Sequence, residues 1–135
     1  MEQETNKINV EKPQTQMRKG MLEFCVLLLI AKGDAYASEI ISGLKDARMI
    51  VVEGTLYPLL TRLKNDGLLT YRWEESVSGP PRKYYTITTA GQAFLGALSR
   101  VWDELSASIE RLREVEPPSI TSETAPSDVL PPPNM

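Results

Sequence analysis

The sequence predicts a mostly α-helical domain that carries one small β-hairpin, which is an α+β fold class. Apolar residues recur at helical spacing in four separate stretches. Two further runs, Leu68–Glu75 and Arg82–Thr88, alternate between two faces with period two, and the loop SVSGPP between them is rich in Gly and Pro. With 135 residues, the chain is long enough for one small domain with tails.

The first helix is expected over Arg18–Lys32, because apolar residues cover nearly its whole circumference. Such a helix must be covered on more than one side, and in so small a protein the second cover is predicted to come from another subunit. Its Cys25 is the only cysteine and is expected to fill core space, which fits a protein of the reducing cytoplasm. Residues 1–16 lack apolar periodicity, and we expect a disordered N-terminal arm there.

A second helix is predicted over Tyr36–Ala47, with Ile40 and Leu44 facing inward. The connector Arg48–Glu53 follows it. Within this connector, Ile50–Val52 is a candidate for a short strand that pairs with the hairpin, because β-branched residues favour extended structure.

The third helix is predicted within Val52–Gly67, VEGTLYPLLTRLKNDG. Its leucines recur at helical spacing and form one apolar face, which consists of Leu56, Leu59, Leu60 and Leu63. Thr55 is expected to cap this helix, and Pro58 is expected near its start, because a proline in the interior removes a backbone hydrogen bond. The outer face is polar, aromatic and basic, which suits a DNA major groove. The alternative is an ordinary solvated face of an amphipathic helix.

A long helix is predicted over residues 89–113, opened by a capping box at Thr89–Gln92. Its apolar residues recur mainly at spacings of three and four, and its length of roughly 37 Å, at about 1.5 Å per residue, exceeds what a small domain can cover. We therefore expect a dimerisation helix. Residues 114–135 are acidic and rich in Pro, Ser and Thr, so we expect a disordered tail.

Charge and composition narrow the classes of function. The net charge is −3, yet residues 17–113 hold 13 basic and 11 acidic residues, so the acidic excess lies in the tails. The chain has no histidine, one cysteine and no glycine-rich phosphate loop, so we expect neither an enzyme, nor a metal site, nor a cofactor. The longest apolar run, Phe24–Ala31, is too short to span a bilayer, and the polar N-terminus is unlike a secretory signal.

The order helix, helix, connector, helix, hairpin is that of a winged helix-turn-helix, which we assign to residues 17–88. In this layout the third helix enters the major groove of DNA. The hairpin, or wing, lies along the phosphate backbone or at the edge of the minor groove.

The segments GTLYPLLTRLKNDGLL, PRKYYTITTAG and GDAYASEII resemble those of the PadR-type transcriptional regulators. The resemblance covers roughly Met17 to Leu112, and the single C-terminal helix is similar to that of the smaller subfamily. It implies a dimeric repressor, often of efflux or phenolic-acid detoxification genes, and in some members a small aromatic ligand releases the DNA. The chain departs from the family at the wing tip, where PPRKYY stands in place of a commoner glycine-arginine pair.

Candidate DNA contacts lie on the second and third helices and on the wing: Ser38, Thr55, Tyr57, Pro58, Thr61, Arg62, Lys64, Arg82 and Lys83. Two of them have a structural alternative, since Tyr57 can pack against the second helix and Pro58 can merely define the helix start. The cations are expected to contact phosphate.

The expected dimer interface comprises Met21, Phe24, Leu28, Leu98, Val101, Trp102, Leu105 and Ile109. The position of Trp102 resembles that of the drug-stacking tryptophan in some multidrug-responsive members, which implies a site for a planar aromatic molecule. The alternative is that this indole only fills the interface.

The predicted function is therefore that of a dimeric, sequence-specific, double-stranded DNA-binding transcriptional regulator. The protein would repress transcription from a pseudo-palindromic operator, and an aromatic ligand would relieve this repression. The competing hypothesis, which the acidic balance allows, is a winged-helix module that binds a protein partner and no DNA.

Overall fold

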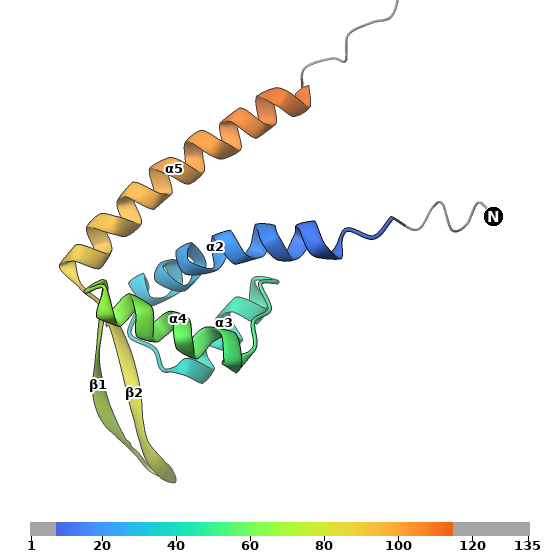
Figure 1. Cartoon of the computed structure of the whole chain (residues 1–135). Coiled ribbons are helices and arrows are strands. Elements are labelled where there is room, and N and C mark those ends of the chain that lie inside the picture. Colours follow the sequence, from blue (N-terminus) through green and yellow to red (C-terminus); the bar gives the residue numbers. More distant parts are fainter. Residues whose placement is uncertain (1–7, 115–135) are drawn as a thin grey trace, which may run out of the picture. The chain divides into compact units, whose positions relative to one another are not determined.

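A computed structural model describes residues 8–114, which form four helices and one antiparallel hairpin (Figure 1). In chain order the elements are α2 (Glu11–Ala31), α3 (Ala37–Asp46), α4 (Glu53–Asn65), β1 (Leu69–Ser76), β2 (Gly79–Ile87) and α5 (Thr89–Glu114). This confirms the predicted α+β fold class with its long C-terminal helix. The disorder predicted for residues 1–7 and 115–135 falls outside the described residues.

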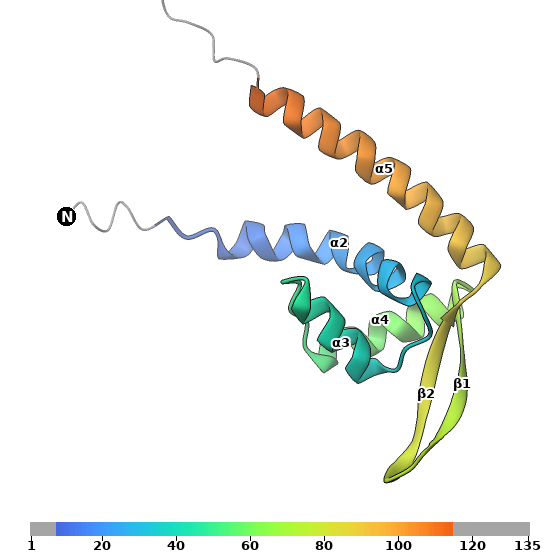
Figure 2. The ribbon, with the colours of Figure 1, turned by 180° about the vertical axis from the view of Figure 1, so that it is seen from behind.

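The described chain divides within α5 into two compact units, of which the first ends at Ser99 and the second begins at Arg100. In the first unit, α2, α3 and α4 enclose the core and the hairpin projects from these helices as a wing, as Figures 1 and 2 show. The second unit is the C-terminal part of α5, up to Glu114. None of the helices in residues 8–114 has the length and apolar character needed to span a membrane.

The helix α2 begins at Glu11, seven residues earlier than the sequence pattern predicts. The side chain of Asn9 accepts a hydrogen bond from the Glu11 backbone N–H at 2.9 Å, and the Gln14 N–H donates to the carbonyl of Val10 at 2.8 Å. Pro13 lies in the first turn of α2, where backbone N–H groups have no partner within the helix, so a proline there removes no helical hydrogen bond. Residues 11–16, which we expected in a disordered arm, are therefore helical. Apolar periodicity could not reveal them because this first part of the helix is polar and exposed.

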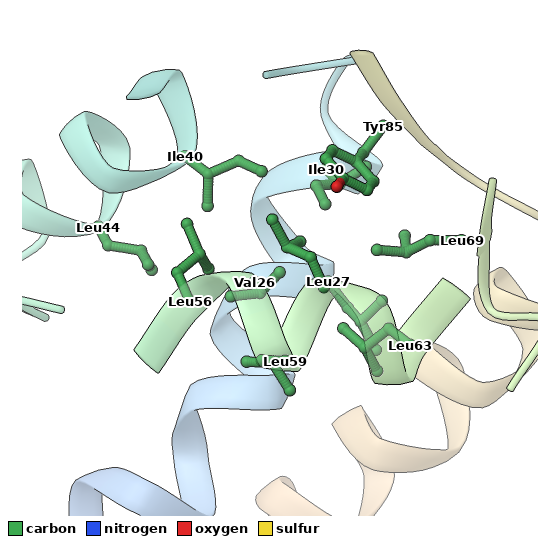
Figure 3. Close-up of a cluster of buried hydrophobic side chains, with 11 residues drawn as sticks. Val26, Leu27, Ile30, Ile40, Leu44, Leu56, Leu59, Leu63, Leu69 and Tyr85 are labelled. Carbon is green, nitrogen blue, oxygen red and sulfur yellow. The ribbon is translucent and has the colours of Figure 1, made fainter. Parts of the chain in front are cut away.

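The core lies between α2, α3, α4 and the base of the wing (Figure 3). It consists of Val26, Leu27, Ile30, Ile40, Leu44, Leu56, Leu59, Leu60, Leu63, Leu69 and Tyr85. The predicted leucine face of α4 is confirmed, because its four leucines are at most 7% exposed. Each buried leucine contributes about 1.5–3 kcal/mol, so this face fixes which side of α4 points outward. Cys25 is half-buried against the core, in agreement with a packing role.

The start of α4 differs from the prediction. The helix begins at Glu53, so Thr55 is its third residue and not its cap, and Pro58 is its sixth. Pro58 therefore lies inside the helix and not near its start. The residue four positions earlier, Gly54, lies on the same exposed side, where water can bond the carbonyl that the proline leaves unpaired.

The predicted hairpin is confirmed, with Leu69 opposite Ile87, Tyr71 opposite Tyr85 and a register shift between Glu74 and Ser76. Ala35, in the loop between α2 and α3, forms an additional backbone pairing with this hairpin. We expected the segment Ile50–Val52 to form such a pairing. Ala35 and Tyr85 exchange both backbone hydrogen bonds, at 3.2 and 2.8 Å. The loop between α2 and α3 is thus joined directly to the wing.

The helix α5 is capped by Thr88, one residue before the predicted capping box. The Thr88 hydroxyl accepts a hydrogen bond from the Gly91 N–H at 2.9 Å and donates to the carbonyl of Gly67 at 2.7 Å. A Cβ atom on Gly91 would lie 2.1 Å from the backbone oxygen of Leu68, so only glycine permits this close start of α5 beside the first strand.

Candidate nucleic-acid interface

A concavity of about 390 Å³ lies in the first unit, between the start of α3, the outer face of α4 and the wing. We call it the α4–wing concavity. It is lined by Tyr36, Ala37, Ser38, Tyr57, Thr61, Trp73, Pro81, Arg82, Lys83 and Tyr85. Five of the predicted DNA contacts, which are far apart in the sequence, therefore lie around one hollow: Ser38, Tyr57, Thr61, Arg82 and Lys83.

The outer face of α4 supplies two hydroxyl groups of the concavity, those of Tyr57 and Thr61. Tyr57 is 47% exposed although it is aromatic, and Thr61 is exposed one turn further along the helix. With Ser38 from α3, these residues present three hydroxyl groups, each able to donate and to accept a hydrogen bond. An exposed helix with such groups can read the donor and acceptor pattern of base edges in a major groove.

The wing supplies two cations, each placed against aromatic rings. The guanidinium of Arg82 lies 4.3 Å from the centre of the Tyr36 ring. The ammonium of Lys83 lies 4.5 Å from the Tyr71 ring and 5.4 Å from the Trp73 ring. Cation–π contacts restrain both side chains. Arg82 is exposed, so its charge stays accessible to an anion, and Lys83 is half-buried.

Four predicted DNA contacts do not line the concavity. Arg62 forms an ion pair with Glu23 of α2 at 2.7 Å, so its side chain is directed toward α2 and its charge is partly balanced. Lys64 lies 5.7 Å from the Tyr71 ring, and Pro58 is exposed on α4. Thr55 faces a different hollow of about 350 Å³, between α2 and the connector that precedes α4.

Five residues of the concavity were not among the predicted contacts: Tyr36, Ala37, Trp73, Pro81 and Tyr85. Tyr36 precedes α3, where its N–H donates to the carboxylate of Glu39 at 3.1 Å. Trp73 is 61% exposed on β1, and period-two alternation places it on the same wing face as Tyr71, which was a signal in the sequence. Tyr85 is a buried lining residue of the concavity, and burial raises the pKa of its phenol.

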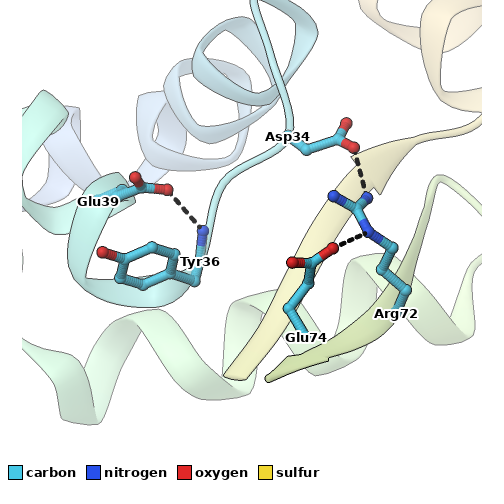
Figure 4. A network of polar contacts seen from close by, with 5 residues as sticks. All are labelled: Asp34, Tyr36, Glu39, Arg72 and Glu74. Atoms are coloured by element: carbon cyan, nitrogen blue, oxygen red, sulfur yellow. Dashed lines mark hydrogen bonds and ion pairs between the residues drawn. The ribbon is translucent and has the colours of Figure 1, made fainter. Parts of the chain in front are cut away.

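A network of polar contacts lies beside the concavity (Figure 4). Arg72 of β1 donates to Asp34 at 2.6 Å and to Glu74 at 3.0 Å. The hydrogen bond from Arg72 lowers the pKa of Asp34, so this carboxyl group stays ionised. Within residues 8–114, no polar or charged side chain is buried and no cluster of three or more acidic, histidine or cysteine side chains could hold a metal ion.

The predicted interface residues are divided between α2 and α5. On α2, Met21 and Phe24 are half-buried and Leu28 is exposed. Leu98 packs against the core of its own unit. In the second unit, apolar side chains between 42% and 74% exposed follow one another along the helix: Val101, Trp102, Leu105, Ile109 and Leu112.

Comparisons with known proteins agree on one family. A family model described as the transcriptional regulator PadR-like family matches residues 26–97. The chain is similar to a PadR-like transcription factor of Bacteroides fragilis, with 60% identity, 76% of this chain and 99% of that chain covered, and a TM-score of 0.65. A PadR-like regulator of Bacillus cereus has 35% identity over 75% and 99% of the two chains, with a TM-score of 0.68. A PadR family regulator of Eggerthella lenta has 32% identity over 79% and 94%, with a TM-score of 0.72.

Proposed function

This chain belongs to the PadR-like family of transcriptional regulators, and we propose that it is a cytoplasmic, homodimeric repressor that binds a pseudo-palindromic operator. Family members are transcriptional regulators and not enzymes, which agrees with the class of function expected from the composition. The observation that carries the proposal is the α4–wing concavity, where hydroxyl groups of two helices and two cations of the wing surround one hollow.

The proposed division of labour follows from the chemistry of each wall. Tyr57 and Thr61 of α4 and Ser38 of α3 contact base edges in the major groove, because hydroxyl groups suit the donors and acceptors found there. Arg82 and Lys83 contact phosphate oxygens, which gives affinity without sequence preference. Thr55, Pro58, Arg62 and Lys64 flank this site on α4, and for Arg62 a DNA contact requires the ion pair with Glu23 to open.

The proposed dimer is formed by α2 and α5. Exposed apolar residues at Val101, Leu105 and Ile109 are one helical turn apart, which is the pattern of a helix that pairs with another apolar surface. Met21, Phe24 and Leu28 supply the corresponding residues on α2. A symmetric dimer places two copies of α4 against half-sites about 10 base pairs apart, centre to centre.

We place the aromatic ligand at Trp102, which is 42% exposed. In the proposed dimer, this indole and that of the second copy stack on both faces of one planar molecule. Aromatic pairs contribute about 0.5–1.5 kcal/mol beyond the burial of area, so two faces and desolvated walls support micromolar affinity. The ligand releases DNA if it binds more tightly to a dimer in which the two α4 helices are wrongly spaced.

Footprinting of the DNA upstream of the gene, at several salt concentrations, tests the operator proposal. We expect two protected half-sites, with affinity that falls steeply as salt rises. If no protection is observed at low salt, or if it is independent of salt, the alternative of a protein-binding winged-helix module is favoured.

Indole fluorescence tests the ligand proposal. The chain has two tryptophans, so Trp73→Phe leaves Trp102 as the only reporter. Flat aromatic cations and phenolic acids are titrated, and we expect saturable quenching that coincides with loss of operator affinity. If no compound quenches Trp102, or if quenching leaves operator affinity unchanged, Trp102 serves only for packing.

A further inference from the structure

The three residues Asp34, Ala35 and Tyr36, which lie between α2 and α3, contact the wing in three different ways. The carboxylate of Asp34 accepts a hydrogen bond from Nη1 of Arg72 at 2.6 Å. Ala35 exchanges backbone hydrogen bonds with Tyr85. The ring of Tyr36 packs edge-on against Tyr84, with centroids 4.9 Å apart. We call residues 34–36 the wing anchor.

Arg72 connects the wing anchor to both strands of the wing. Its Nη1 atom bonds Asp34, its Nε atom bonds Glu74 of the same strand at 3.0 Å, and its guanidinium lies 5.3 Å from the ring of Tyr84 on β2. Figure 4 shows the Arg72 side chain extending from β1 toward Asp34, with Glu74 beside it. The planar fork of an arginine can hold two carboxylates in fixed directions at once, which a lysine cannot do.

These contacts lead to the cation proposed to meet phosphate. Arg72 lies against Tyr84, Tyr84 packs on Tyr36, and Tyr36 lies 4.3 Å from the guanidinium of Arg82. The buried core holds the base of the wing through Leu69 and Tyr85 but includes no residue of its outer half. The Asp34–Arg72 pair is solvent-exposed, so it contributes little to folding stability. Its main consequence is therefore the position of the wing.

We infer that Arg72 is a positioning residue for DNA binding, which ties the wing to the wing anchor and thereby holds Arg82 in place beside α4. This inference rests on the proposed operator binding. Without the tie to Asp34, the outer half of the wing can pivot about the Ala35–Tyr85 bridge. Arg82 then loses its fixed distance from the outer face of α4, and an ordered phosphate contact becomes less populated.

The matched variants Asp34→Asn and Glu74→Gln test this inference. Each removes one negative charge next to Arg72, so a simple change of the electrostatic field would strengthen operator binding equally in both. Only Asp34→Asn weakens the link between wing and anchor, because Glu74 lies on the same strand as Arg72. We expect Asp34→Asn to weaken operator binding by between about 2- and 5-fold, because an exposed ion pair contributes at most about 1 kcal/mol, and Glu74→Gln to leave operator binding unchanged or tighter. Equal effects of the two variants would overturn the inference.

A double-mutant cycle of Arg72→Met and Arg82→Ala separates positioning from direct contact. If Arg72 acts through Arg82, then Arg72→Met weakens binding in the wild type and has no further effect in the Arg82→Ala background. If the two losses multiply, and the dependence of affinity on salt falls again in the double variant, Arg72 itself contacts phosphate and the inference is wrong.

Two controls keep the outcomes distinct. Thermal unfolding by circular dichroism verifies that each variant is folded at the assay temperature, and if Arg72→Met is not, the cycle is run with Asp34→Asn. If the wild type binds no operator DNA, the proposed function has failed. If the wild type binds and Asp34→Asn behaves like Glu74→Gln, the proposed function stands and the positioning role of Arg72 is rejected.

Discussion

Two exposed surfaces of this chain carry opposite chemistry. The α4–wing concavity presents hydroxyl groups, aromatic rings and the cations Arg82 and Lys83. The C-terminal part of α5 instead presents a row of apolar residues that includes Val101, Leu105 and Ile109. Each surface includes an exposed aromatic ring on a helix, Tyr57 on α4 and Trp102 on α5. Exposure by itself therefore does not identify a partner.

The difference between the surfaces indicates which partner each one suits. Cations and hydroxyl groups can match phosphates and base edges, whose attraction weakens as salt screens it. A row of aliphatic side chains gains free energy only when another apolar surface removes it from water, and that gain depends little on salt. The following variants separate the two surfaces, beginning with the largest expected effect.

Charges introduced into the row of α5 should cause the largest change. Leu105→Asp with Ile109→Asp would bury two unpaired carboxylates in the proposed interface, at several kcal/mol each, and raise the dissociation constant of the dimer by more than about a hundredfold. Sedimentation measures this change, and operator affinity should fall with it. Glu110→Gln, on the neighbouring face of α5, is the control and should leave the dimer intact. If the wild type is monomeric at micromolar concentration, the apolar row of α5 is not a dimer interface.

Substitutions on the reading face of α4 should affect base preference and not the dimer. A single mismatch in an operator typically costs about 1–3 kcal/mol, and Tyr57→Ala or Thr61→Ala should abolish much of that discrimination at one position of each half-site. Binding to a panel of single-base operator variants measures it. Ser42→Ala, exposed on α3 outside the concavity, is the matched control. If affinity for every operator falls equally, the reading face has been misplaced.

The two surfaces should also respond differently to salt. Removing one phosphate contact by Arg82→Ala or Lys83→Ala should lower the slope of log affinity against log salt by about 0.9, so between 50 and 200 mM salt the variant loses about 3.5-fold less affinity than the wild type. The dissociation constant of the wild-type dimer should change little over the same range. Lys45→Ala, a cation of α3 outside the concavity, is the control. A slope that is unchanged in both wing variants would show that these cations do not contact phosphate.

The smallest effect concerns pH. The hydrogen bond from Arg72 lowers the pKa of Asp34 in the folded protein, with smaller contributions from a hydrogen bond of Thr86 and from the charge of Arg72. Glu74 is the other carboxylate that faces Arg72. A lowered pKa stabilises the folded state above the unfolded value of about 3.9, and this stability is lost as the pH falls through the folded value. Urea unfolding should therefore show a small advantage of wild type over Asp34→Asn at pH 7 that disappears in acid. The effect of Leu112→Ala, which removes no titratable group, should not depend on pH in this way.

Several features could be predicted from the sequence because they depend on local periodicity. The leucines of α4 recur at helical spacing, so their burial on one face follows from the geometry of any helix that packs against a core. The period-two alternation of the two strands predicts the wing in the same way, although Gly79, Pro80 and Pro81, which we expected in the loop, belong to β2. Hydroxyl and cationic residues on the outer sides of these elements could be named as candidates before their mutual distances were known.

Element ends were less predictable, because they depend on single hydrogen bonds. The start of α2 at Glu11 rests on the side chain of Asn9, and the cap of α5 rests on Thr88, whose hydroxyl also reaches Gly67. Pro58 is tolerated within α4 because it lies on an exposed side of that helix. A pattern of residue types contains too little information to decide between neighbouring capping groups.

From the sequence alone, the approximate positions of the helices, the buried face of α4 and a set of candidate DNA contacts could be predicted, whereas the first turns of α2 could not. The contacts between elements became known only from the fold: Arg62 pairs with Glu23, Ala35 and not Ile50–Val52 pairs with the wing, and Arg72 joins Asp34 to Glu74. The reason is physical. Periodicity arises from the geometry of one element, whereas a contact between residues 38 or 39 positions apart depends on how several elements pack together.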